Sequence, residues 1–281
     1  MRPVYLPASL DQLWPLLEQN PGAAMMAGGS DLLVRLRHGG DNPPALVGLE
    51  RIAELGRVRD EEPGWLFLGA TATHSLLLDH PLVATRLPIL AQALKVLGSP
   101  LIRNQGTLGG NLCTASPAGD TLPALYALGA RVELRSAGGV RHLDVADFIL
   151  GPGRVDLRSG EILYGVWTPT AGEWTVSHFE KVGRRQALAI AVVSLAALIR
   201  LDAGGLVKEA RLAWGSVGPT VMRAPRAEQA LMGRPLDRAS LERAAELARQ
   251  AVNPMDDGRA SAHYRRQVAG NLLLRLKRQT D

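Results

Sequence analysis

The part of the chain that decides its fold reads Gly98-Ser-Pro-Leu-Ile-Arg-Asn-Gln-Gly-Thr-Leu-Gly-Gly-Asn-Leu-Cys-Thr-Ala-Ser-Pro-Ala-Gly-Asp-Thr121. This stretch is too long and too rich in small polar residues for a plain turn. We expect its Gly109-Gly110 pair to expose backbone N–H groups, and three side chains add further donors: Thr107, Asn111 and Thr114. Asp120 adds an acceptor for sugar-type hydroxyl groups. This mixture suits a diphosphate joined to a polyol, and the alternative is a buried polar loop whose groups satisfy one another.

A second glycine-rich stretch lies upstream and reads Ala27-Gly28-Gly29-Ser30-Asp31. The apolar run Ala23–Ala27 is strand-like, a helical pattern begins at Leu32, and Pro44–Leu49 is typical of the next strand. The pattern predicts a β-α-β unit with the glycines at the turn from strand to helix. Free N–H groups at such a turn bind anions, and the alternative is a tight turn followed by an N-cap. The stretch matches neither the Rossmann pattern G-x-G-x-x-G nor the P-loop.

Length and composition indicate a globular chain of two packed units. The chain has 281 residues, a mass of 30.1 kDa and 46% hydrophobic residues, which is more than one average domain needs. Its single cysteine, Cys113, excludes an internal disulfide and any four-thiolate zinc or iron–sulfur site built by this chain alone. We interpret Cys113 as a small buried hydrophobe. The six histidines show no metal-ligand spacing.

The charge pattern does not favour a nucleic-acid partner. The formal net charge is +5 and the pI about 9.8, but the basic residues are scattered and form no single stripe. Pro3 and Pro7 interrupt the start of the chain, which therefore does not resemble a secretory leader. The longest apolar stretch, Ala187–Ile199, has 13 residues, whereas a membrane span needs about 20. We expect no membrane span and a cytoplasmic location.

The composition changes near Thr175. Three strand-like segments come first, Val176–Val182, Ile190–Leu201 and Leu206–Trp214, and three helical segments follow, Ala224–Met232, Ser240–Ala251 and Ala262–Lys277. Strands followed by helices predict an α+β domain with a three-stranded antiparallel sheet and a helical bundle. We place an N-terminal domain at residues 1–174, with subdomains of about 1–55 and 56–174, and the C-terminal domain at residues 175–281.

Both glycine stretches resemble the two flavin loops of one family. Met26–Leu33 and Gly98–Thr121 are similar to those of the FAD-binding subunits of the molybdenum hydroxylases, such as the medium subunit of carbon monoxide dehydrogenase and the FAD parts of xanthine and aldehyde dehydrogenases. The similarity spans nearly the whole chain, because three further segments also resemble the family: Pro7–Asp11, Asp147–Gly153 with Glu161–Leu163, and Ser261–Arg266. It implies an FAD-binding domain of the PCMH type, made of two small α/β subdomains, followed by the α+β C-terminal domain.

The resemblance also implies which residues hold FAD. The first stretch would wrap the pyrophosphate through backbone N–H groups, with these residues: Ala27, Gly28, Gly29, Ser30, Asp31 and Leu32. A second cradle would contain Thr107, Gly110, Asn111 and Thr114. Asp120 would bind hydroxyls of the FAD sugar or ribityl chain, Leu163 would pack near the flavin, and Lys181 falls where the family often has a lysine close to the cofactor.

The resemblance finally implies a multi-subunit oxidoreductase. The chain would be an electron-transfer subunit in which FAD receives electrons from [2Fe–2S] clusters of a small iron–sulfur subunit and passes them to a terminal acceptor. A large molybdopterin subunit would complete the enzyme, as a dimer of heterotrimers. No catalytic side chain and no metal ligand is expected in this chain. Two alternatives are a stand-alone FAD-dependent oxidoreductase and a non-catalytic nucleotide-binding module.

Overall fold

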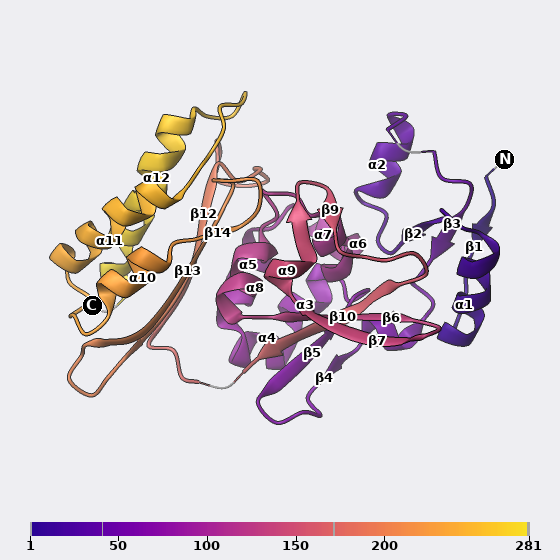
Figure 1. Cartoon of the computed structure of the whole chain (residues 1–281), viewed down its shortest axis with the longest axis horizontal. Helices are drawn as coiled ribbons and strands as arrows, with labels where there is room; N and C mark the ends of the chain where they lie inside the picture. Colours follow the sequence, from indigo (N-terminus) through magenta and orange to yellow (C-terminus); the bar gives the residue numbers. More distant parts are fainter. Residues whose placement is uncertain (1, 41, 171, 280–281) are drawn as a thin grey trace. The chain divides into compact units, whose positions relative to one another are not determined.

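The computed structural model describes residues 2–40, 42–170 and 172–279, and the chain divides into two compact units (Figure 1). The first unit comprises the chain up to Leu77 together with Ser99–Ala115 and Ala130–Pro169. The second unit comprises Leu78–Gly98, Ser116–Gly129 and the chain from Thr170 onward. No helix in these described ranges is long and apolar enough to cross a membrane.

The first unit begins with a parallel three-stranded sheet of order β1-β3-β2. Its elements are β1 (Val4–Tyr5), α1 (Leu10–Gln19), β2 (Ala24–Met26), α2 (Leu32–Arg37) and β3 (Leu46–Gly48). Because β2 and β3 pair in parallel and α2 connects them, the predicted β-α-β unit is confirmed. Helix α1 begins after Ser9, whose Oγ accepts a hydrogen bond from the Gln12 amide at 3.3 Å.

The same unit contains an antiparallel five-stranded sheet of order β4-β5-β10-β6-β7. The remaining elements are η1 (Ala53–Gly56), β4 (Val58–Arg59), β5 (Trp65–Gly69), α3 (His74–Asp79, whose last two residues belong to the second unit), α6 (Pro100–Gln105), α7 (Leu108–Thr114), β6 (Arg131–Ser136), β7 (Gly139–Asp144), α9 (Val145–Phe148), β8 (Ile149–Gly151), β9 (Arg154–Val155) and β10 (Ile162–Pro169). Phe67 on β5 is fully buried and lies 5.0 Å from the ring of Trp167 and 5.5 Å from that of Tyr164. These rings form a core with residues of the three-stranded sheet and of α1.

The second unit contains an antiparallel sheet of order β11-β12-β13-β14. Its elements are α4 (Pro81–Arg86), α5 (Pro88–Val96), α8 (Thr121–Leu128), β11 (Val176–Val182), β12 (Val193–Leu201), β13 (Val207–Gly215), β14 (Met222–Arg223), α10 (Pro225–Leu231), α11 (Arg238–Ala251), α12 (Ala262–Leu274) and η2 (Arg275–Gln279). The predicted order of strands followed by helices is confirmed, and the three expected strands gain a short fourth, β14. The strand expected from Ile190 begins at Val193.

Two helices from the first half of the sequence pack on this sheet. Helix α5 contacts β11, and α8 contacts β12 and β13, while α10 and α12 also lie against the sheet. Helix α8 is buried along its whole length, as expected of an apolar helix covered by a sheet. The α10–α12 helices close the second core around Trp214, whose indole N–H donates to the Ala269 carbonyl at 3.0 Å. The buried residues of this core all come from the part of the chain between Val176 and Leu276.

Candidate cofactor site

The first glycine stretch forms the turn from β2 to α2, where it was expected. Gly29 has a φ of +67°, a left-handed conformation that favours glycine. A Cβ on Gly28 would lie 1.7 Å from the carbonyl oxygen of Gln105, so only glycine allows the two backbones to approach this closely. The amide N–H groups from Gly28 to Leu32 donate no hydrogen bond to another group in the described part of the chain. They are therefore available to an anion.

The second glycine stretch is helical, although a loop was expected. Residues 100–105 form α6 and residues 108–114 form α7, with Thr107 as the N-cap of α7. The prediction that Gly109-Gly110 exposes free N–H groups is wrong. The Gly109 amide donates to the Ala70 carbonyl at 2.8 Å, and the Gly110 amide donates to Thr107 Oγ1 at 3.1 Å. The first amides of a helix have no acceptor within the helix, and here the N-cap Thr107 and the Ala70 carbonyl accept their hydrogen bonds.

The role of Gly109 is close packing. A Cβ there would lie 2.7 Å from both the Cβ and the carbonyl oxygen of Ala70. Neither of these Ala70 atoms can rotate away, so a side chain at this position would clash. The Thr107 hydroxyl keeps its proton as a donor while its oxygen accepts from Gly110. The Gly109 and Gly110 amides are therefore not available to an anion, whereas the Thr107 hydroxyl is.

The two stretches meet in the first unit at two points. Gly28 lies against the Gln105 carbonyl, as described above, and Thr114 Oγ1 donates to Asp31 Oδ2 at 3.2 Å. The same carboxylate oxygen lies 3.2 Å from Arg35 Nε. Segments about 80 residues apart in the sequence thus form one cradle.

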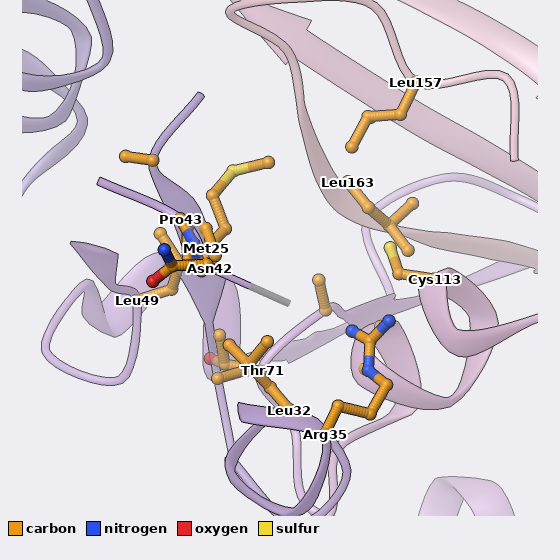
Figure 2. A pocket seen from close by; sticks show the side chains of 16 residues that line it. Met25, Leu32, Arg35, Asn42, Pro43, Leu49, Thr71, Cys113, Leu157 and Leu163 are labelled. Atoms are coloured by element: carbon orange, nitrogen blue, oxygen red, sulfur yellow. The ribbon is translucent and has the colours of Figure 1, made fainter. Parts of the chain in front are cut away.

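A cavity of about 490 Å³ opens beside this cradle (Figure 2). Four predicted residues line it, Ala27, Leu32, Gly110 and Leu163, together with Ala23, Ala24, Met25, Arg35, Asn42, Pro43, Leu49, Ala70, Thr71, Gly109, Cys113 and Leu157. Figure 2 shows Leu157, Leu163 and Cys113 on one side and Met25, Pro43 and Leu49 on the other. Largely apolar walls with a few polar groups suit a planar heteroaromatic ring.

A second cavity, of about 380 Å³, shares Ala27 and Thr71 with the first. Its predicted lining residues are Gly28, Gly29 and Thr107. Ser30, Asp31, Asn111 and Thr114 line neither cavity. Thr71 lines both cavities, and the sequence did not indicate it. Thr71 belongs to no motif, and only the fold brings it close to the glycine stretches.

Cys113 cannot act as a nucleophile at neutral pH. Burial raises the pKa of its thiol to about 12, so that the neutral form persists. It contributes a small neutral surface to the first cavity and is half-buried, not fully buried as the sequence interpretation had it.

Asp120 and Lys181 lie together in the second unit. Lys181 Nζ donates to Asp120 Oδ2 at 2.6 Å and to the Val96 carbonyl at 3.1 Å, and both side chains are nearly buried. Burial raises the pKa of Asp120 to about 6, and the charge and hydrogen bond of Lys181 lower it in part. Asp120 Oδ1 is buried and has no hydrogen-bond partner among the described residues. A buried acceptor without a partner is costly, and a ligand hydroxyl group would satisfy it.

The features of the first unit fit FAD. The amides from Gly28 to Leu32 offer donors for a diphosphate, and the cavity of about 490 Å³ offers an apolar slot.

Comparison with known proteins agrees with this chemistry. Residues 1–171 match the family described as the FAD binding domain in molybdopterin dehydrogenase, and residues 177–280 match the CO dehydrogenase flavoprotein C-terminal domain. The chain is 35% identical over 260 residues to the xanthine dehydrogenase FAD-binding subunit of Escherichia coli O157:H7, covering 92% of this chain and 88% of that protein. It is 30% identical to the nicotinate dehydrogenase FAD-subunit of Eubacterium barkeri, over 97% of this chain and 93% of that protein. A chain in the crystal structure of quinoline 2-oxidoreductase from Pseudomonas putida 86 superposes with a TM-score of 0.93 at 32% identity, covering 100% of this chain and 96% of the other.

Proposed function

Because the chain belongs to the family of FAD-binding subunits of the molybdenum hydroxylases, we propose that it is the electron-transfer subunit of such an oxidoreductase. In this role FAD receives electrons from [2Fe–2S] clusters of a partner subunit and delivers them to a terminal acceptor. The observation that carries the proposal is the row of unused amide groups from Gly28 to Leu32, fixed where two glycine stretches meet. FAD supplies the redox chemistry, and this chain binds and orients it.

The proposed roles of the residues follow their environments. Backbone N–H groups from Ala27 to Leu32 hold the pyrophosphate, and the second cradle comprises Thr107, Gly110, Asn111 and Thr114. Leu163 forms an apolar wall near the flavin. Asp120 accepts a hydroxyl hydrogen at Oδ1, while Lys181 keeps this buried carboxylate ionised by holding Oδ2. The matched ranges support a boundary between the two domains near residue 174.

Visible absorption of the purified chain tests FAD binding. We expect flavin bands after addition of FAD and desalting. Asp120→Ala should lose them, because it removes a buried carboxylate oxygen that lacks a partner among the described residues. Asp79→Ala, at an exposed position on α3, is the matched control and should retain them. A chain that stays colourless alone and also when purified with its genomic neighbours would contradict the proposal.

The proposed complex contains a small iron–sulfur subunit and a large molybdopterin subunit, as a dimer of heterotrimers in the cytoplasm. Relatives named as medium chains or subunits support a multi-subunit assembly. Co-expression with the neighbouring genes, followed by size-exclusion chromatography and metal analysis, tests the composition. Isolation of a single-chain enzyme that turns over a substrate without partners would favour the stand-alone oxidoreductase instead.

A further inference from the structure

The first glycine stretch is poorly anchored by packing. Helix α2, which follows it, has only six residues and none of them is buried. Leu33 and Val34 are 49% and 52% exposed. A helix this short is not stable by itself in water, so contacts outside α2 must fix the amides from Gly28 to Leu32.

Asp31 is placed to cap α2 but does not do so. It occupies the N-cap position, where an aspartate side chain ordinarily accepts a hydrogen bond from an amide of the first turn. No such bond forms, and Asp31 Oδ2 accepts instead from Thr114 Oγ1 at 3.2 Å. Arg35 Nε lies 3.2 Å from the same oxygen. The carboxylate therefore caps no amide of α2 but joins the Arg35 side chain of α2 to Thr114 on α7.

Thr114 sits on a fixed support. It is the last residue of α7, and the next residue, Ala115, turns the chain with a left-handed φ of 46°. Ala115 is buried, and its carbonyl accepts from the Gly153 amide at 3.3 Å. The end of α7 can thus hold the weakly packed α2 in place.

We propose that the side chains of Asp31 and Thr114 form a latch that holds the first glycine stretch on α7, so that these two side chains position the FAD site without contacting FAD. The inference rests on the proposed FAD-binding function. Neither residue lines either cavity. The negative charge of a carboxylate close to a diphosphate would repel it, and at Asp31 the positive charge of Arg35 compensates that charge. The latch holds the amides from Gly28 to Leu32 in their binding positions before FAD binds.

The rate of FAD release from the full chain tests the latch. Thr114→Val and Asp31→Leu should each release FAD about five- to tenfold faster, the effect of losing one partly exposed hydrogen bond to a charged group. Thr114→Ser and Asp31→Asn keep a donor and an acceptor, and should stay within about twofold of the unmodified chain. Thr85→Val is the matched control, because the Thr85 hydroxyl bonds only carbonyls of its own helix.

The double variant distinguishes a latch from two separate ligands. With a latch, Thr114→Val adds nothing once Asp31→Leu is present, because the bond is already lost. In both single variants, hydrogen exchange of the apo chain should quicken only at residues 33–37, whose amides are hydrogen-bonded. If Thr114→Val loses protection throughout the chain, Thr114→Ala replaces it in the test. Multiplying effects in the double variant, or unchanged release in both single variants, would overturn the latch. Failure of the unmodified chain to bind FAD at all would instead refute the proposed function.

Discussion

Replacing Lys181 by methionine should make the stability of the second unit strongly dependent on pH. The side chains of Asp120 and Lys181 are only 10% and 7% exposed, and 2.6 Å separates Oδ2 from Nζ. Burial raises the pKa of Asp120 to about 6, and Lys181 opposes this rise by its charge and its hydrogen bond. The substitution removes both opposing effects and leaves desolvation alone, so the pKa of Asp120 moves above 6.

The sign and size follow from linkage between protonation and folding. The folded-state pKa of Asp120 already exceeds the ordinary value of 3.8, so the folded chain binds this proton more tightly than the unfolded chain. Stability therefore rises as the pH falls through 6, by about 1 kcal/mol between about pH 8 and 5.5. In Lys181→Met, each further unit of the Asp120 pKa adds about 1.4 kcal/mol to this change. Near pH 8 the variant should lose about 3 kcal/mol, since a buried charge has lost its partner.

Urea unfolding of the apo chain, followed by circular dichroism near pH 8 and near pH 5.5, measures both quantities. The loss caused by Lys181→Met should be largest near pH 8 and shrink near pH 5.5, where Asp120 is protonated. The double variant Lys181→Met/Asp120→Asn carries no titrating group at this position and is the matched control. An equal loss at both pH values would refute the reasoning, because Lys181 would then stabilise the fold without acting through the Asp120 charge.

Three further predictions concern other parts of the chain. Gly28→Ala should abolish FAD retention with little change in melting temperature, because the new Cβ would meet the Gln105 carbonyl. Gly258→Ala is the control and should retain FAD, because no atom lies within 4 Å of its Cβ position. Equal retention of FAD by both variants would contradict this prediction. Arg265→Met should lower stability by about 3 kcal/mol in thermal melts, since the buried guanidinium bonds two backbone carbonyls and a carboxylate; an unchanged melting temperature would show these bonds to be dispensable. Cys113, with its pKa raised to about 12, should react with a thiol reagent at least about 100-fold faster after unfolding in urea. Rapid reaction of the native chain would argue against the raised pKa.

Features of the fold that depend on neighbouring residues could be predicted from the sequence. The N-cap at Ser9 and the β-α-β unit ending at Leu49 follow from caps, glycines and apolar spacing within a few residues. The hairpin of β12 and β13 follows from the turn at Asp202–Gly205. Residues close together in the sequence determine each of these features, so no contact with a distant segment is needed to predict them.

The errors came where a distant partner decides the local structure. The glycines of α7 suggested a loop because glycine is a weak helix former, but Gly109 is required for contact with Ala70 on another segment. The pairs Asp31–Thr114 and Asp120–Lys181 are separated by 83 and 61 residues, respectively. A single sequence contains no signal that links such residues, so motifs indicated the site residues but not their mutual contacts.

The two carboxylates of the candidate site differ in what they leave unsatisfied. Asp31 is exposed, and Oδ2 serves Thr114 and Arg35 within the fold. Asp120 is buried, and its Oδ1 lacks a partner in the described part of the chain, so the folded apo chain carries the penalty of that group. A ligand hydroxyl that donates to Oδ1 would remove the penalty and favour the ionised carboxylate, which lowers the pKa of Asp120 from about 6. Binding of a hydroxyl group at this oxygen therefore stabilises the second unit most above pH 6, where Asp120 is charged without a ligand.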